Sequence, residues 1–168
     1  MPISQLRFLL RANFPMLVGF GIFTLYCAQR YAGFMIVPIA LIGLLYQTVR
    51  LLAAWRVPEQ RAVRLTALLI VLLSVLIVGG CHAIHHQRAR AEADRVVALI
   101  ERFYAQNQRY PNTLDELGFD PKVLRQSLGR YGYNVHEGNP FLVYNTTFVL
   151  FDKWAYDFGK NKWAYEAD

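Results

Sequence analysis

The second half of this chain lacks an excess of charge of either sign, although the chain as a whole is basic. Its 168 residues carry a formal net charge of +6. Residues 1–87 contain seven arginines and a single acid, Glu59, whereas residues 88–168 contain eleven basic and eleven acidic side chains. Binding to nucleic acid phosphates requires a basic face. The neutral second half therefore argues against nucleic acid as a partner.

Sequence motifs of catalysis are also missing. The chain contains no G-x-S-x-G nucleophile turn, no H-E-x-x-H metal motif and no glycine-rich phosphate loop. His82 and His86 are four residues apart, a spacing that suits a metal on one helix face, but no neighbouring acid completes the set. We therefore expect no enzyme activity, no cofactor, no bound metal and no small-molecule substrate.

Apolar residues, by contrast, are abundant and make up 55% of the chain. Three stretches, at about 14–29, 31–55 and 65–85, predict transmembrane helices, since a helix needs about 20 apolar residues to cross a bilayer. The clearest is Leu65–Ile84, which contains no charged residue. The first stretch is short, and a cleaved signal peptide over residues 1–28 is an alternative interpretation. Residues 1–87 are thus predicted to be a membrane domain.

The arginines of this domain predict its orientation. Arg7 and Arg11 precede the first stretch, and only Arg30 lies between the first and the second. Four more flank the loop between the second and third, namely Arg50, Arg56, Arg61 and Arg64. Basic loops stay in the cytoplasm. We therefore expect a multi-pass protein of a bacterial inner membrane, with a cytoplasmic N-terminus and residues 88–168 in the periplasm.

Two site hypotheses follow from this topology. Cys27 and Cys81, the only cysteines, would both lie near the periplasmic surface, where an oxidising compartment permits a disulfide. Two free thiols that fill space as small apolar side chains are the alternative. The small residues Gly79, Gly80 and Ala83 predict a face on which helices pack closely within the membrane.

Residues 88–168 are predicted to begin with a helix that continues the third stretch as far as Gln108. Small and apolar residues recur along it at spacings of three and four from Ala89 to Phe103, which is typical of a buried helix face. A capping-box pattern, Thr113-Leu-Asp-Glu116, begins a second, short helix that Gly118 closes. Asp120-Pro121 begins a third.

The remaining residues alternate in the manner of antiparallel strands. The predicted strands are Tyr131–His136, Pro140–Asn145, Phe148–Phe158 and Trp163–Glu166. A turn at Gly159–Lys162 would place Phe158 opposite Trp163 and Tyr156 opposite Tyr165. We expect Trp163 and Tyr165 to pack on the long helix. The predicted fold class is thus a three-helix membrane domain with a small α+β domain that contains an antiparallel sheet.

Residues 88–119, RARAEADRVVALIERFYAQNQRYPNTLDELGF, together with the final sheet, resemble the periplasmic head of the major type II secretion pseudopilin, a relative of type IV pilins. The resemblance implies a pilin-like fold for about half of the chain. Pseudopilins have one membrane helix behind a cleavable leader, with a glutamate near its start. Here three apolar stretches precede the head, and Leu65–Ile84 contains no glutamate. We therefore do not expect a true pseudopilin that is processed and polymerises.

These features together predict a non-catalytic inner-membrane protein that acts by binding. Its partners would be the lipid bilayer and another protein. The first hypothesis is an immunity protein that neutralises a bacterial toxin acting on the membrane or in the periplasm, since such a protein is small, membrane-bound and needs no catalysis. The alternative is an accessory factor of type IV pilus or type II secretion assembly that contacts pilin-like subunits.

Overall fold

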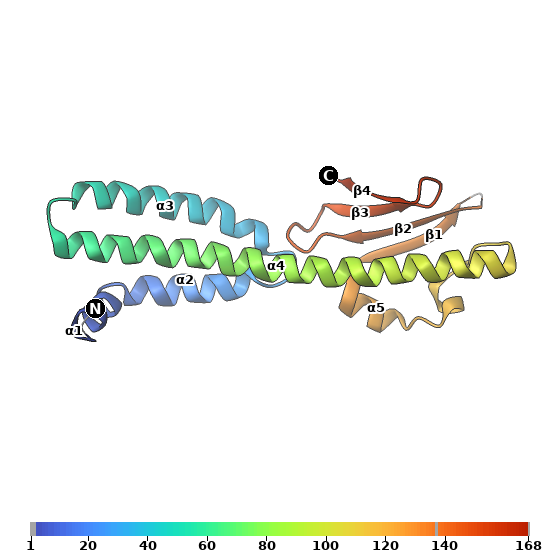
Figure 1. The fold of residues 1–168 in the computed structure, drawn as a ribbon, viewed down its shortest axis with the longest axis horizontal. Coiled ribbons are helices and arrows are strands. Elements are labelled where there is room, and N and C mark those ends of the chain that lie inside the picture. The colour runs from blue at the N-terminus through green and yellow to red at the C-terminus, as the bar shows by residue number, and fades with distance from the viewer. Residues whose placement is uncertain (1–2, 137, 168) are drawn as a thin grey trace. The chain divides into compact units, whose positions relative to one another are not determined.

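The computed structural model describes residues 3–136 and 138–167 and forms two compact units, which divide between His82 and Ala83. The sequence placed the boundary between residues 87 and 88. The chain is mostly helical and has one small antiparallel sheet (Figure 1). Both units share the long helix α4 (Pro58–Asn107). The predicted continuation of the third apolar stretch as a single helix is therefore confirmed, with its last residue at Asn107 rather than Gln108.

The first unit contains three further α-helices and one short 3-10 helix. These are α1 (Ile3–Ala12), α2 (Phe14–Cys27), η1 (Gly33–Met35) and α3 (Ile36–Ala53). The segment Gly33–Ala53 and α4 are each long and apolar enough to cross a membrane. Helices α1 and α2 meet this criterion only together, across a bend of 68°. The described residues, 3–136 and 138–167, thus contain two candidate spans, or three if the bent pair forms one.

Polar and small residues hold the helices of the first unit together. At the bend between α1 and α2, the buried Asn13 side chain donates from Nδ2 to the Leu9 carbonyl at 3.1 Å and to the Val63 carbonyl of α4 at 3.3 Å. Gly43 of α3 is a point of close approach, because an added Cβ would lie 3.3 Å from Phe20 of α2 and 3.7 Å from Val71 of α4. Close approach of helices at a small residue such as Gly43 is typical of helix packing in a membrane.

The second unit, called the head from here on, begins at Ala83 within α4. It continues with η2 (Leu114–Leu117), α5 (Pro121–Leu128) and the strands β1 (Tyr131–His136), β2 (Asn139–Asn145), β3 (Lys153–Asp157) and β4 (Lys162–Glu166). The strands form one antiparallel sheet in the order β1-β2-β3-β4. The predicted small antiparallel sheet is therefore confirmed.

One face of α4 forms the centre of the head's core. The buried residues of α4 are Ala89, Ala93, Val96, Val97 and Ile100. They cluster with Leu124 and Leu128 of α5 and with Leu142 and Tyr144 of β2. The predicted apolar helix face is confirmed along most of its length, but Phe103 at its end is only half-buried.

The third strand is shorter than predicted. Residues 148–152, assigned to the strand from their apolar pattern, lie in a loop before β3. The hydroxyl of Thr146 bonds with the backbone of Val149, and the Asn145 amide donates to the Leu150 carbonyl at 2.6 Å. Side chains of this kind compete with strand pairing for backbone hydrogen bonds, which explains why the strand begins only at Lys153.

The predicted register of the β3–β4 hairpin is wrong by two residues. Tyr156 lies opposite Trp163, and Trp154 lies opposite Tyr165. The Asp157 carboxylate accepts hydrogen bonds at 3.0 Å from the backbone N–H groups of both Gly159 and Lys160, which tightens the turn before the predicted position. Because the shift is two residues, the same side chains still share one face.

Tyr165 also differs from its prediction. Its side chain does not pack into the core and remains about half exposed, at 51%. It lies against Trp154 instead, with ring centroids 5.4 Å apart. Trp163, by contrast, contacts the core as expected.

The helix caps agree with the sequence in part. Asp120 accepts a hydrogen bond from the Lys122 N–H at 2.7 Å, and Gly118, at a φ of +77°, ends η2. The capping box is incomplete, because the Thr113 side chain makes no cap hydrogen bond. Glu116 instead accepts from the Asn112 N–H at 2.8 Å.

Candidate functional site: an arginine between two tryptophans

The most distinctive side-chain arrangement of the head surrounds Arg90, which lies on α4. The Arg90 guanidinium carbon is 4.7 Å from the centroid of the Trp163 ring and 5.6 Å from that of Trp154. Both tryptophans lie on the β3–β4 hairpin. A cation over an aromatic face is attracted by the ring's electrons, with about 0.5–2 kcal/mol per contact. Arg90 therefore connects the helix to both strands while its side chain stays 33% exposed.

Asp94, one turn further along α4, fixes this arrangement. Its Oδ1 lies 3.2 Å from Nε of Arg90 and accepts a hydrogen bond at 2.7 Å from the indole N–H of Trp163. Each of the three side chains thus contacts the other two. Arg90 and Asp94 are one helical turn apart in the sequence, but nothing local indicates their contacts with the tryptophans; the hydrogen bond from Trp163 to Asp94 joins residues 69 positions apart.

Aromatic side chains surround these three residues. Trp163 makes edge contacts with the rings of Tyr144 and Tyr156 at 5.3 and 5.1 Å. Burial raises the pKa of the Tyr144 hydroxyl, whereas the neighbouring charge of Arg90 lowers it in part. Trp154 contacts Tyr165 on its other side. We call the solvent-accessible part of this cluster, formed by Arg90, Asp94, Trp154, Trp163 and Tyr165, the Arg90 surface.

A groove of about 540 Å³ adjoins the Arg90 surface, between α4 and β4. Arg90, Asp94, Glu101, Tyr156 and Lys162 contribute to its lining. The Tyr156 hydroxyl donates to Glu101 at 3.4 Å, and burial together with the Glu101 charge raises the pKa of Tyr156. The groove therefore offers charges of both signs beside aromatic rings.

The two cysteines of the first unit are free thiols in the structure. Cys27 is buried and Cys81 is partly exposed. The carbonyl oxygen of Cys27 lies 2.8 Å from Nε2 of His82, the residue after Cys81. Because a carbonyl only accepts, Nε2 must donate. His82, considered from the sequence for a metal-compatible spacing with His86, thus joins the end of α2 to α4.

The small residues proposed as a helix-packing face lie on the surface. Gly79 and Gly80 are exposed, and an added Cβ would meet no described atom within 4 Å at either position. Ala83 is exposed as well. Within the described residues, these glycines therefore take no part in close helix contacts, whereas Gly43 does.

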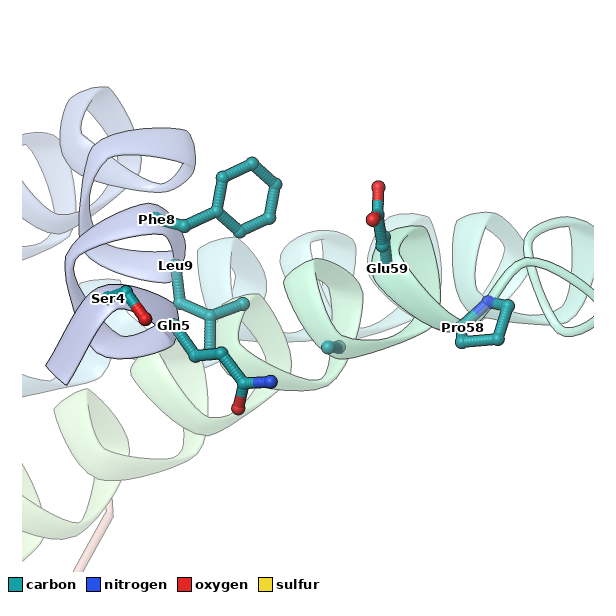
Figure 2. A pocket seen from close by; sticks show the side chains of 7 residues that line it. Ser4, Gln5, Phe8, Leu9, Pro58 and Glu59 are labelled. Atoms are coloured by element: carbon teal, nitrogen blue, oxygen red, sulfur yellow. The ribbon is translucent and has the colours of Figure 1, made fainter. Parts of the chain in front are cut away.

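A second hollow, of about 510 Å³, lies in the first unit where α1 approaches the start of α4. Figure 2 shows Phe8 and Leu9 of α1 on one side, and Pro58 and Glu59 of α4 on the other. Among the residues that the structure describes, Glu59 is the one titratable side chain in its lining.

The described residues, 3–136 and 138–167, contain no group of three or more His, Cys, Asp or Glu side chains that could hold a metal ion. Comparisons of the chain with protein-family models, with curated proteins and with solved structures found no match in any of the three.

Proposed function

We propose that this chain is a non-catalytic, membrane-anchored protein whose head binds another protein. The Arg90 surface carries this proposal. Tryptophan, tyrosine and arginine are the residues that contribute most to protein–protein binding energy. Here Arg90 is already held by Asp94 and two indole rings. A surface fixed in this way loses little side-chain entropy when a partner binds.

In this proposal the chain crosses a bacterial inner membrane three times, through the bent pair α1–α2, through Gly33–Ala53 and through the apolar part of α4. The length and composition of these helices support the spans. The concentration of arginine beside α1 and between α3 and α4 supports a cytoplasmic N-terminus. Three crossings then place the head in the periplasm.

The partner that we propose first is a bacterial toxin that acts on the membrane or in the periplasm, so that the chain is an immunity protein. A head tethered to the membrane meets such a toxin at its place of action. Neutralisation by binding needs a complementary surface and no catalytic group, and the Arg90 surface provides the former.

A second candidate is an accessory role in type IV pilus or type II secretion assembly. The order of elements in the head supports it: a long helix is followed by two short helices and an antiparallel meander. This order accords with the resemblance of residues 88–119 to a pseudopilin head. The partner would then be a pilin-like subunit.

The test uses the full chain and two variants of α4. Arg90→Met keeps the length of the side chain but removes its charge from the Arg90 surface. Arg102→Met makes the same change at an exposed position of the same helix. Cells that express each protein are challenged with a toxin encoded beside the gene. We expect protection by the wild type and by Arg102→Met, and loss of protection by Arg90→Met.

Two results would contradict this account. Full protection by a folded Arg90→Met variant would exclude the Arg90 surface as the binding site. No protection by the wild type, combined with a defect in piliation or secretion after deletion of the gene, would exclude immunity and support the assembly role.

A further inference from the structure

We propose that the loop between β2 and β3, residues 146–152, inserts its apolar side chains into the lipid headgroup region from which α4 emerges. The inference rests on the proposed membrane anchoring of α4 and adds a second membrane contact, made by the head itself.

The composition of this loop is unusual for a surface connection. Its sequence is Thr-Thr-Phe-Val-Leu-Phe-Asp, with four consecutive apolar residues. Phe151 is 65% exposed, and Phe148, Val149 and Leu150 are half-buried. Surface loops are generally polar, so a run of four apolar residues, one exposed and three half-buried, is unusual there and suggests an interaction site.

Backbone groups of Thr146, Val149, Leu150 and Asp152 are paired by hydrogen bonds within and beside the loop. The Thr146 hydroxyl donates a hydrogen bond to the Val149 carbonyl and accepts one from the Val149 N–H. The Asn145 amide donates to the Leu150 carbonyl, and the Thr146 N–H donates to the Asp152 carbonyl at 2.8 Å. A backbone that enters an apolar medium must be paired in this way, because lipid offers no hydrogen bonds. The loop can therefore leave water without exposing these groups.

Contacts along β3 place the loop at the end of the head where α4 enters. Trp154 at the start of β3 contacts His86, with ring centroids 5.9 Å apart. Tyr156 bonds to Glu101, and Phe158 beyond the strand's end contacts Tyr110. The strand thus runs in the direction of α4, and the loop that precedes it lies beside the helix's first residues in the head (Figure 1).

This end of the head adjoins the apolar stretch of α4. Ile84 is the last residue of that stretch, and His86 follows two residues later, a rise of about 3 Å along the helix. The headgroup region is about 5–8 Å deep on each side of the hydrocarbon. Trp154, beside His86, therefore lies at headgroup depth, as does its neighbour Tyr165. Tryptophan and tyrosine are the residues enriched at this depth.

The charged residues of the loop region are compatible with a lipid surface. Asp152 is the only acid in the loop, and its carboxylate accepts a hydrogen bond from the Tyr165 hydroxyl. Lys153, the next residue, forms an ion pair with Glu166 at 3.8 Å. Arg88 is exposed on α4, two residues after His86. No unpaired acid of the loop thus opposes contact with anionic phospholipid.

The test uses the full chain in nanodiscs of phosphatidylethanolamine and phosphatidylglycerol. Trifluoromethyl-phenylalanine replaces one phenylalanine at a time, at Phe151, at Phe141 or at Phe14. Phe141 is the matched control, since it is also exposed but lies on β2 opposite Asp157, near the other end of the head. Phe14 reports on α2. Each fluorine signal is measured with nitroxide-labelled lipid and, separately, with a water-soluble gadolinium chelate.

We expect the lipid nitroxide to broaden the fluorine signals at positions 14 and 151 until they are lost. The fluorine signal at position 141 should stay sharp in the same sample. The water-soluble gadolinium chelate should broaden the signal at position 141 and leave the signals at positions 14 and 151 sharp. With the lipid nitroxide, loss of the signal at position 14 together with a sharp signal at position 151 would overturn the inference while leaving the membrane anchor intact. The apolar loop would then be assigned to a protein partner. A sharp signal at position 14 would contradict the anchor itself.

Discussion

The two units of this chain differ in the kind of side chain that α4 exposes. In the first unit, large apolar residues such as Leu69, Leu73 and Leu76 of α4 are exposed, whereas the polar side chains of Asn13 and His82 are buried. In the head, α4 buries apolar side chains and exposes charged ones. Val96 and Ile100 of the same helix are buried, and Arg102 is exposed.

This difference is the one expected of a helix that passes from lipid to water, as we propose for α4. In the first unit, exposed leucines suit lipid, and the helices are held by small residues and by hydrogen bonds such as His82 to Cys27. In the head, apolar residues are removed from water, and this burial drives folding at about 25 cal/mol per Å². A given substitution on α4 should therefore have a different effect in each unit.

The largest expected difference is between Ile100→Ala and Leu73→Ala, two truncations in α4. Ile100 is fully buried in the head, and its truncation should lower the free energy of unfolding by about 2–5 kcal/mol. Leu73 is 58% exposed in the first unit, and its truncation should change stability by about 0.5 kcal/mol or less. Thermal unfolding of the full chain in nanodiscs measures both. Equal losses would contradict the proposed difference between the units.

A smaller effect is expected for Trp163→Ala. A fully buried tryptophan would cost about 3–5 kcal/mol on truncation, but Trp163 is only half-buried, so we expect about 2 kcal/mol. Trp163→Phe keeps an aromatic ring but loses the N–H donated to Asp94, at a cost of about 1 kcal/mol. Chemical unfolding followed by near-UV circular dichroism measures both losses. A loss from Trp163→Ala no larger than that from Tyr165→Ala would show that Trp163 adds nothing to the core.

The smallest effect is a pH dependence at Tyr133, whose hydroxyl donates to the Pro111 carbonyl at 2.8 Å. Burial raises the pKa of Tyr133 from 10 to about 12. The folded state thus favours the neutral phenol, and this stabilisation is complete below pH 10 and is lost as the pH rises to about 12. Tyr133→Phe should cost about 1 kcal/mol at neutral pH. The difference in stability from the wild type should shrink between pH 10 and 12, whereas a constant difference would contradict the assigned cause.

Local sequence signals predicted most of the elements. The apolar spacing from Ala89 to Ile100 identified the buried helix face, and Asp120-Pro121 identified the start of α5. The residues of β1 were predicted without error. Each of these features depends on neighbours within a few positions, which a sequence displays directly.

Features that depend on distant residues were missed. One local feature was also missed, because the Asp157 carboxylate accepts hydrogen bonds from the Gly159 and Lys160 N–H groups and sets an earlier turn than the predicted one. The Arg90 surface and the His82–Cys27 hydrogen bond join residues more than 50 positions apart. The sequence next to Arg90 and His82 does not indicate which residues they contact. Tertiary contacts alone determine them.

The most direct test of the account is the side of the membrane on which each part lies. Alkaline phosphatase, which is active only in the periplasm, is fused in separate experiments after Arg30, after Pro58 and after Asp168. We predict activity for the fusions at 30 and 168 and none at 58, because the bent pair α1–α2, the segment 33–53 and α4 each cross once. Activity at 58, or its absence at 168, would contradict a periplasmic head and, with it, the proposed binding function.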